Sequence, residues 1–145
     1  MSTKRDMLEH VMSVPVITIN VIDTLRVAAE CMVKNNIGAI VVVEGNKPVG
    51  IVTERDVTKQ VITGDDALTK LVSQVMSHPL RVSTKETTIQ EVFEIMLEHR
   101  IRRLPIVENN ELVGIVTEKD LMRWVLRVSY EPNIPKHIKA VLDSR

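Results

Sequence analysis

Apolar residues recur with helical spacing in two separate segments of the chain. The i, i+3, i+4, i+7 pattern is met at Leu25, Ala28, Ala29 and Met32, and again at Ile89, Val92, Phe93 and Met96. This spacing predicts two helices that each lay one apolar face on a core. We expect Asp23 to cap the first helix, and Thr87 with Gln90 to form a capping box at the second.

Runs rich in β-branched residues surround each predicted helix. A short extended stretch precedes each helix, and two β-rich runs follow it: 16–19, 39–43 and 49–52 in the first unit, and 80–83, 104–107 and 112–116 in the second. Gly45-Asn46 and Asn109-Asn110 separate the paired runs, and such dipeptides are typical of two-residue hairpin turns. A further helix is expected to begin near Thr53 and near Thr117. Each unit is therefore predicted to be β-α-β-β-α.

The two units are copies of one pattern. Val11-Met-Ser-Val-Pro15 returns as Val75-Met-Ser-His-Pro79, and the octapeptide at 49–56 returns at 113–120, both with an offset of 64 residues. A single register kept from position 11 to position 56 indicates an internal duplication. Because a copy of about 60 residues buries little surface alone, we expect the copies to share a core across a pseudo-twofold axis. The predicted domains are 8–64 and 72–128, followed by a C-terminal tail at 129–145.

Composition narrows the class of protein. The chain has 145 residues, of which 44% are hydrophobic and 26% charged, as in ordinary globular proteins. Its 19 basic and 19 acidic residues balance, which argues against binding to DNA or to an anionic membrane surface by bulk charge. The longest apolar run, at 39–43, is far shorter than the roughly 20 residues of a membrane span. A single cysteine, Cys31, favours a cytoplasmic location.

Neither catalysis nor metal binding is predicted. The four histidines are scattered without metal-ligand spacing. The sequence contains no motif that places a nucleophile next to a base, and no glycine-rich phosphate loop.

The repeated Gly-Ile-Val-Thr-Glu-[Arg/Lys]-Asp motif carries the candidate chemistry. Each copy supplies a hydroxyl, a cation and a carboxylate where a strand passes into a helix: Thr53, Arg55 and Asp56 in the first, and Thr117, Lys119 and Asp120 in the second. One interpretation is a Thr-x-x-Asp capping box that complements the helix dipole. The other is an anion site at the helix N-terminus, with the hydroxyl and the cation facing a phosphate and the carboxylate accepting from ribose hydroxyls.

Two β-α-β-β-α copies that each end in G-h-h-[S/T]-x-x-D resemble a CBS-domain pair, also called a Bateman module. The resemblance covers about residues 8–128, and both copies of the motif match, at Gly50, Thr53 and Asp56 and at Gly114, Thr117 and Asp120. It implies an α/β (α+β) fold of two pseudo-twofold-related repeats that pack through their sheets and leave two related clefts. In that family the clefts bind adenosine-containing ligands such as AMP, ADP, ATP or S-adenosylmethionine. The family's Asp holds the ribose, its Ser/Thr faces phosphate, and the base lies against aliphatic strand backbone.

The resemblance also implies that the two clefts differ. The stronger cleft is expected to bring together Thr117, Lys119, Asp120, Arg102, Arg103, Ile17, Ile37, Gly38 and Ala39. The weaker cleft is expected to contain Thr53, Arg55, Asp56, Arg81, Ile101 and Arg102. In the weaker cleft the bulky Arg81 takes the place of Ile17, and Gly38 and Ala39 take the place of two arginines. Because Arg102 and Arg103 begin a predicted strand, alternation predicts that at most one of them reaches a given cleft.

These patterns together predict a regulatory module without catalysis, which needs no cofactor, binds AMP, ADP or ATP and passes its occupancy to a partner protein. A homodimer is expected through helical faces near 57–71 and 121–128. Two alternatives stay open: a ligand-free dimerisation or scaffold protein, and a nucleic-acid-binding accessory protein that uses the basic cluster 99–103. The absence of interleaved aromatic residues in that cluster argues against the nucleic-acid alternative.

Overall fold

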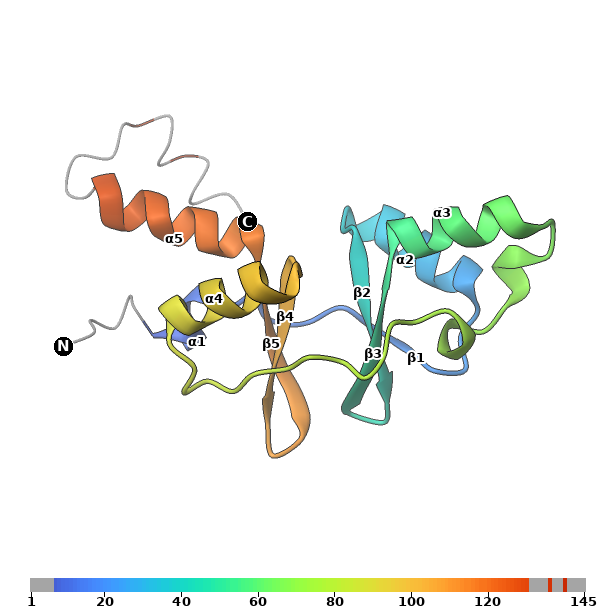
Figure 1. Ribbon diagram of the computed structural model, residues 1–145, viewed down its shortest axis with the longest axis horizontal. Coiled ribbons are helices and arrows are strands. Elements are labelled where there is room, and N and C mark those ends of the chain that lie inside the picture. The colour runs from blue at the N-terminus through green and yellow to red at the C-terminus, as the bar shows by residue number, and fades with distance from the viewer. Residues whose placement is uncertain (1–6, 131–135, 137–139, 141–145) are drawn as a thin grey trace.

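The computed structural model describes residues 7–130, 136 and 140, and it places two sheets back to back between two layers of helices (Figure 1). The first repeat contains β1 (Thr18–Asn20), α2 (Leu25–Asn35), β2 (Ala39–Glu44), β3 (Lys47–Thr53) and α3 (Glu54–Thr63). The second contains α4 (Ile89–His99), β4 (Arg103–Glu108), β5 (Glu111–Thr117) and α5 (Glu118–Tyr130). Three short segments lead into or join the repeats: α1 (Leu8–Val11), η2 (Ala67–Thr69) and η3 (Val72–Gln74). The predicted mixed fold of repeats packed through their sheets is confirmed.

Both hairpins close as the sequence predicts. β2 pairs antiparallel with β3, and β4 with β5, through two-residue turns. Gly45, Asn109 and Asn110 have φ values of 66°, 52° and 65°, which is the left-handed region that tight hairpin turns require. Each hairpin also has a register shift at the same place in the repeat, between Val42 and Val43 and between Ile106 and Val107.

The first strand differs between the repeats. β1 pairs in parallel with β2 along three residues, whereas its counterpart in the second repeat makes only one bridge, between Ser83 and Ile106. The predicted strand at 80–83 is therefore reduced to a single bridging residue. The reason lies in β4, where Pro105 stands at the position of Val41. A proline has no N–H to donate, so the parallel ladder does not extend toward Arg81.

The caps of α2 and α4 lie one residue later than predicted. Thr24 caps α2, and Thr88 forms a capping box with Glu91 at the start of α4. The predicted caps, Asp23 and Thr87, lie in the turns before these helices. In both helices the buried apolar stripe begins directly after the threonine, and this packing sets the first helical residue.

The two repeats exchange their leading segments. The segment at the start of the described chain packs Leu8, Val11 and Met12 into the core of the second repeat, and α1 contacts α5 there (Figure 1). Conversely, η3 packs Val72 into the core of the first repeat. The structure thus has two core clusters rather than the single shared core that we expected. Each cluster is completed by residues that belong, by sequence, to the other repeat.

The glycine of each repeated motif accommodates this exchange. A β-carbon on Gly50 would overlap the side chain of Met76, and one on Gly114 would overlap the side chain of Met12. Both methionines come from the exchanged leading segments. The motif glycines therefore serve packing between the repeats.

Across the described ranges, no helix is both long and apolar enough to cross a membrane. Of the tail predicted at 129–145, residues 129 and 130 end α5. The rest of the tail, apart from residues 136 and 140, lies outside the described residues.

Candidate functional site

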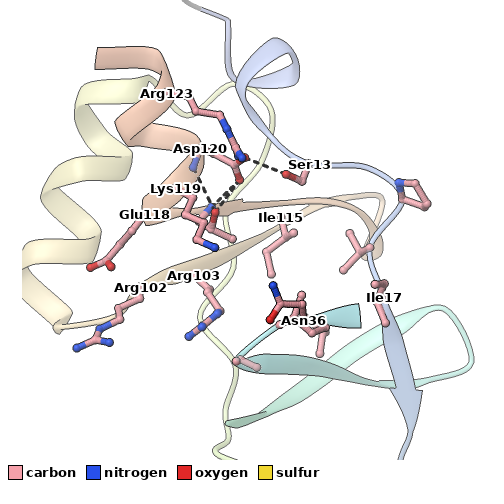
Figure 2. Close-up of a pocket in the computed structure, with 17 residues that line it drawn as sticks. Ser13, Ile17, Asn36, Arg102, Arg103, Ile115, Glu118, Lys119, Asp120 and Arg123 are labelled. Carbon is pink, nitrogen blue, oxygen red and sulfur yellow. Dashed lines mark hydrogen bonds and ion pairs between the residues drawn. The ribbon is translucent and has the colours of Figure 1, made fainter. Parts of the chain in front are cut away.

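A pocket of about 380 Å³ lies between the repeats where β5 passes into α5 (Figure 2). We call it the first cleft. Its volume falls within the range of about 300–1,000 Å³ that is usual for small-molecule sites. It is lined by all nine residues predicted for the stronger cleft: Thr117, Lys119, Asp120, Arg102, Arg103, Ile17, Ile37, Gly38 and Ala39.

Asp120 lies in the first turn of α5 and is only 1% exposed. Its Oδ2 accepts hydrogen bonds from the backbone N–H of Thr117 at 2.9 Å and from the Thr117 hydroxyl at 3.0 Å. The backbone N–H of Asp120 donates in turn to the Thr117 hydroxyl at 3.3 Å. These contacts are the capping box that the motif predicts. The ribose contact remains a prediction, and Asp120 lines the pocket although almost all of its surface is covered.

Ser13 is a lining residue that the sequence analysis did not identify. Its hydroxyl donates to Oδ1 of Asp120 at 2.9 Å, and Nη1 of Arg123 lies 3.8 Å from the same oxygen (Figure 2). Ser13 is 107 positions away from Asp120 in the chain and reaches it because the leading segments are exchanged. The available signal was the repeated Val-Met-Ser, but that repeat alone does not show which element the serine contacts.

The wall of the first cleft opposite α5 comes from the first repeat. Ile17, Ile37 and Ala39 make this wall aliphatic. Asn36, which ends α2 with a left-handed φ of 51°, also lines the cleft. Asparagine at the C-terminal end of a helix is a signal for this conformation, so the position of Asn36, though not its neighbours, was accessible from the sequence. The cleft therefore offers an apolar face to a ligand on one side and a polar helix start on the other.

Arg102 and Arg103 both line the first cleft, contrary to the expectation that at most one would do so. β4 begins at Arg103, so Arg102 lies before the strand and is not governed by its alternation. The Arg103 guanidinium lies over Gly38, where a β-carbon would be 2.9 Å from Nη2. Burial lowers the pKa of Arg103, and the charge of Arg102 lowers it further, whereas Glu118 and Glu54 raise it. Because an arginine guanidinium stays protonated in proteins, Arg103 remains a cation at neutral pH.

A second pocket, of about 670 Å³, lies on the other side of Arg103, next to the start of α3. We call it the second cleft. Of the residues predicted for the weaker cleft, Thr53, Arg55, Arg81, Ile101 and Arg102 line it, and Asp56 does not. The two clefts share Gly38, Arg102 and Arg103. Gly38 stands in the first repeat where an arginine stands in the second. The second cleft nevertheless has cations on this side, because Arg102 and Arg103 of the second repeat line both clefts.

Asp56 forms the same capping box as Asp120. Its Oδ2 accepts from the Thr53 backbone N–H at 2.8 Å and from the Thr53 hydroxyl at 3.0 Å, and its N–H donates to that hydroxyl at 3.1 Å. Ser77, the counterpart of Ser13, lines the second cleft but makes no hydrogen bond to Asp56 within the described part of the chain. In the first repeat the motif aspartate thus serves the helix start and does not face the pocket.

Within the described residues, neither cleft contains a cluster of metal-ligating side chains. Among residues 7–130, 136 and 140 there is no group of three or more His, Cys, Asp or Glu side chains that could hold a metal ion. The arrangement at the first cleft combines hydrogen-bond acceptors, cations and an aliphatic wall, which suits reversible binding of a polar small molecule.

Comparisons with known proteins identify the family. The chain is 38% identical over 115 residues to the CBS domain-containing protein YhcV of Bacillus subtilis, a match that covers 79% of this chain and 81% of the relative. The crystal structure of Hypoxic Response Protein I with two coordinated zinc ions superposes with a TM-score of 0.73 at 30% identity, covering 81% of this chain and 97% of that one. The CBS domain pair of protein MJ0100, in complex with 5′-methylthioadenosine and S-adenosyl-L-methionine, superposes with a TM-score of 0.74 at 26% identity, covering 82% and 98%. The model of the CBS domain matches residues 8–63 and 72–127, and the chain therefore belongs to the CBS-domain family.

Proposed function

We propose that this protein is a regulatory module that binds an adenine nucleotide, AMP, ADP or ATP, in the first cleft and performs no catalysis of its own. One observation carries the proposal: a single pocket unites a buried carboxylate at a helix start, a group of cations and an aliphatic wall. The structure of the related MJ0100 domain pair, which contains two adenosine-based ligands, supports this class of ligand.

The proposed ligand makes its ribose contact at Asp120. Oδ2 of Asp120 already accepts two hydrogen bonds from Thr117, and a carboxylate oxygen has two lone pairs. The ribose hydroxyl is therefore expected at Oδ1, in the place of the Ser13 hydroxyl. Ser13 can give up this position by rotating its side chain, since two backbone hydrogen bonds to Ile115 hold its main chain in place.

The remaining parts of the nucleotide follow from the ribose position. The phosphate lies at the start of α5, where the positive end of the helix dipole favours an anion. Lys119, Arg102 and Arg103 add positive charge on that side (Figure 2). The adenine lies against Ile17 and Ile37.

Calorimetric titration and thermal unfolding with AMP, ADP, ATP, S-adenosylmethionine and NAD test the proposal. A ligand present at 100 times its Kd adds about 2.7 kcal/mol to the free energy of unfolding, which raises the melting temperature by several degrees. If no adenine nucleotide at millimolar concentration raises the melting temperature, the scaffold alternative holds. A gel shift with RNA that weakens steeply with salt would favour the nucleic-acid alternative.

We also propose that the module is a homodimer through α3 and α5 and that the dimer presents the nucleotide-dependent surface to a regulated partner protein. Both helices expose large apolar side chains, among them Ile62 at 80% and Met122 at 63% exposure. Apolar surface of this kind is typical of the cores of homodimer interfaces. Ile62→Asp and Met122→Asp are expected to yield monomers in analytical ultracentrifugation. Ile22→Asp, at an equally exposed apolar residue outside the helices, is the control that leaves the mass unchanged.

A further inference from the structure

The second cleft carries a concentration of positive charge. Glu54 is the one acidic residue in its described lining. None of its arginines forms an ion pair with a carboxylate within the described chain. Guanidinium groups that outnumber the carboxylates around them repel one another, and an anion between them reduces that repulsion. The arginines that line the cleft are Arg55, Arg81, Arg100, Arg102 and Arg103.

The internal duplication shows which of these charges are particular to the second cleft. Arg81 stands where the first cleft has Ile17, and Arg100 stands where it has Asn36. Asn36 and Arg100 have the same left-handed backbone, with φ values of 51° and 53°, and each lines the cleft at the end of its helix. The backbones are equivalent, so the two sites differ in side-chain chemistry: an apolar and an amide residue in one, two guanidinium groups in the other.

The features that would recognise a nucleoside are missing from the second cleft. Asp56 does not line it, and the side of the pocket where Ile17 stands in the first cleft is occupied by Arg81. Asp56 is not part of the pocket wall, and an adenine placed as in the first cleft would lie against a charged group. The second cleft is therefore unlike a second copy of the first.

We propose that the second cleft binds a compact inorganic polyanion of the pyrophosphate class. The planar guanidinium group donates two parallel hydrogen bonds to phosphate oxygens, and five arginines line one pocket of about 670 Å³. The start of α3, which is the positive end of its helix dipole, lies at the same pocket. This site goes beyond the proposed nucleotide site in the first cleft, and the experiment below distinguishes failure of one from failure of the other.

Calorimetric titration with inorganic pyrophosphate in magnesium-free buffer tests the proposal. We expect saturable binding with one site per chain and a Kd below about 1 mM. Arg81→Ile and Arg100→Asn place the first cleft's own residues in the second cleft, and each is expected to weaken pyrophosphate binding by about tenfold or more. Neither substitution strains the fold, because Arg81 is exposed and asparagine tolerates the left-handed backbone at position 100. Thermal unfolding of the free variants checks this.

Lys119→Ala is the matched control in the first cleft. It should weaken AMP binding and leave the affinity for pyrophosphate unchanged. Loss of pyrophosphate binding in Lys119→Ala, but not in Arg81→Ile, would place the anion in the first cleft and overturn the proposal, as would absence of saturable binding below 1 mM.

Three other ligands identify the source of the phosphate chemistry. Adenosine should bind Arg81→Ile as tightly as it binds the wild-type protein. If Arg81→Ile weakened ADP binding as strongly as pyrophosphate binding, the second cleft would take the phosphate tail of a nucleotide. Single-stranded RNA that binds more tightly than pyrophosphate and loses affinity in the same variants would mean that the arginines serve a nucleic-acid surface. The ADP result and the RNA result would each overturn the proposal. Binding of pyrophosphate without any binding of AMP would leave it standing and refute the proposed function instead.

Discussion

The two clefts are built from the same heptapeptide pattern and the same capping box, yet they present different chemistry. Thr53 with Asp56 and Thr117 with Asp120 make equivalent hydrogen bonds within their helices. Asp120 nevertheless lines its cleft, and Asp56 does not. A copy of the motif therefore establishes a strand-to-helix junction, and the residues that arrive from the other repeat decide what that junction can bind.

The serines of the two leading segments show this difference most directly. Ser13 is held to Ile115 by backbone hydrogen bonds of 2.8 and 3.2 Å, and Ser77 is held to Ile51 by bonds of 2.9 and 3.2 Å. Of these two serines, only Ser13 donates its hydroxyl to a motif aspartate within the described residues. Ser13 and Ser77 thus have equivalent main-chain pairing but different side-chain contacts. The Asp120 carboxylate gains the Ser13 hydroxyl as a partner, and a ligand hydroxyl can replace it.

Matched substitution of the two aspartates gives the largest expected difference between the clefts. Asp120→Asn should weaken AMP binding by about tenfold to a hundredfold, because a hydrogen bond to a charged group contributes about 1.5–3 kcal/mol. Asp56→Asn should leave calorimetric AMP affinity within about twofold, since Asp56 does not line its cleft. Two equal AMP sites per chain, or a larger loss in Asp56→Asn, would contradict the assignment.

The 2′-deoxy form of AMP separates ribose recognition from helix capping. On the wild-type protein it should bind more weakly than AMP, whereas on Asp120→Asn the two nucleotides should differ little. This pairing is a double-mutant cycle with the ligand as one partner. Strictly additive losses would show that Asp120 serves only as a helix cap.

Substitution of the two serines tests the contact that the exchange creates. Ser13→Ala removes a donor to a buried carboxylate and should lower the free energy of unfolding by about 1–3 kcal/mol. Ser77→Ala, at an exposed residue with no such contact, should change it by less than about 0.5 kcal/mol. Urea unfolding followed by circular dichroism measures both. AMP affinity should not fall in Ser13→Ala if the ribose takes over the serine's position, and a marked loss would show that Ser13 itself holds the ligand.

The shared residues between the clefts lead to the smallest predicted effect. Arg102 and Arg103 line both pockets, so pyrophosphate in the second cleft draws on charge that an AMP phosphate needs. Saturating pyrophosphate should lower the affinity for AMP by about fivefold, which is at the low end of ordinary coupling between sites. Adenosine has no phosphate and should bind equally well with or without pyrophosphate. Equal weakening of AMP and adenosine would show that the two ligands compete for the same cleft.

Local patterns in the sequence determined the elements of this fold. The 3.6-residue spacing of apolar positions located α2 and α4, the Gly-Asn and Asn-Asn dipeptides located both hairpin turns, and the Thr-x-x-Asp spacing located the starts of α3 and α5. These features depend on residues a few positions apart. The caps of α2 and α4 were misplaced by one residue because two adjacent residues can each cap a helix, and only packing decides between them.

The composition of the first cleft followed from the family resemblance, since all nine expected residues line it. The tertiary structure alone decided how the clefts differ. The Ser13 contact joins residues 107 positions apart, and it exists because the leading segments are exchanged between the repeats. Arg102 reaches both clefts because it lies before β4 and is not subject to strand alternation, and Arg103 extends across the boundary because Gly38 leaves space for its guanidinium. No spacing along the chain encodes such contacts, because they depend on which surfaces of two separately patterned units come together when each buries its apolar face.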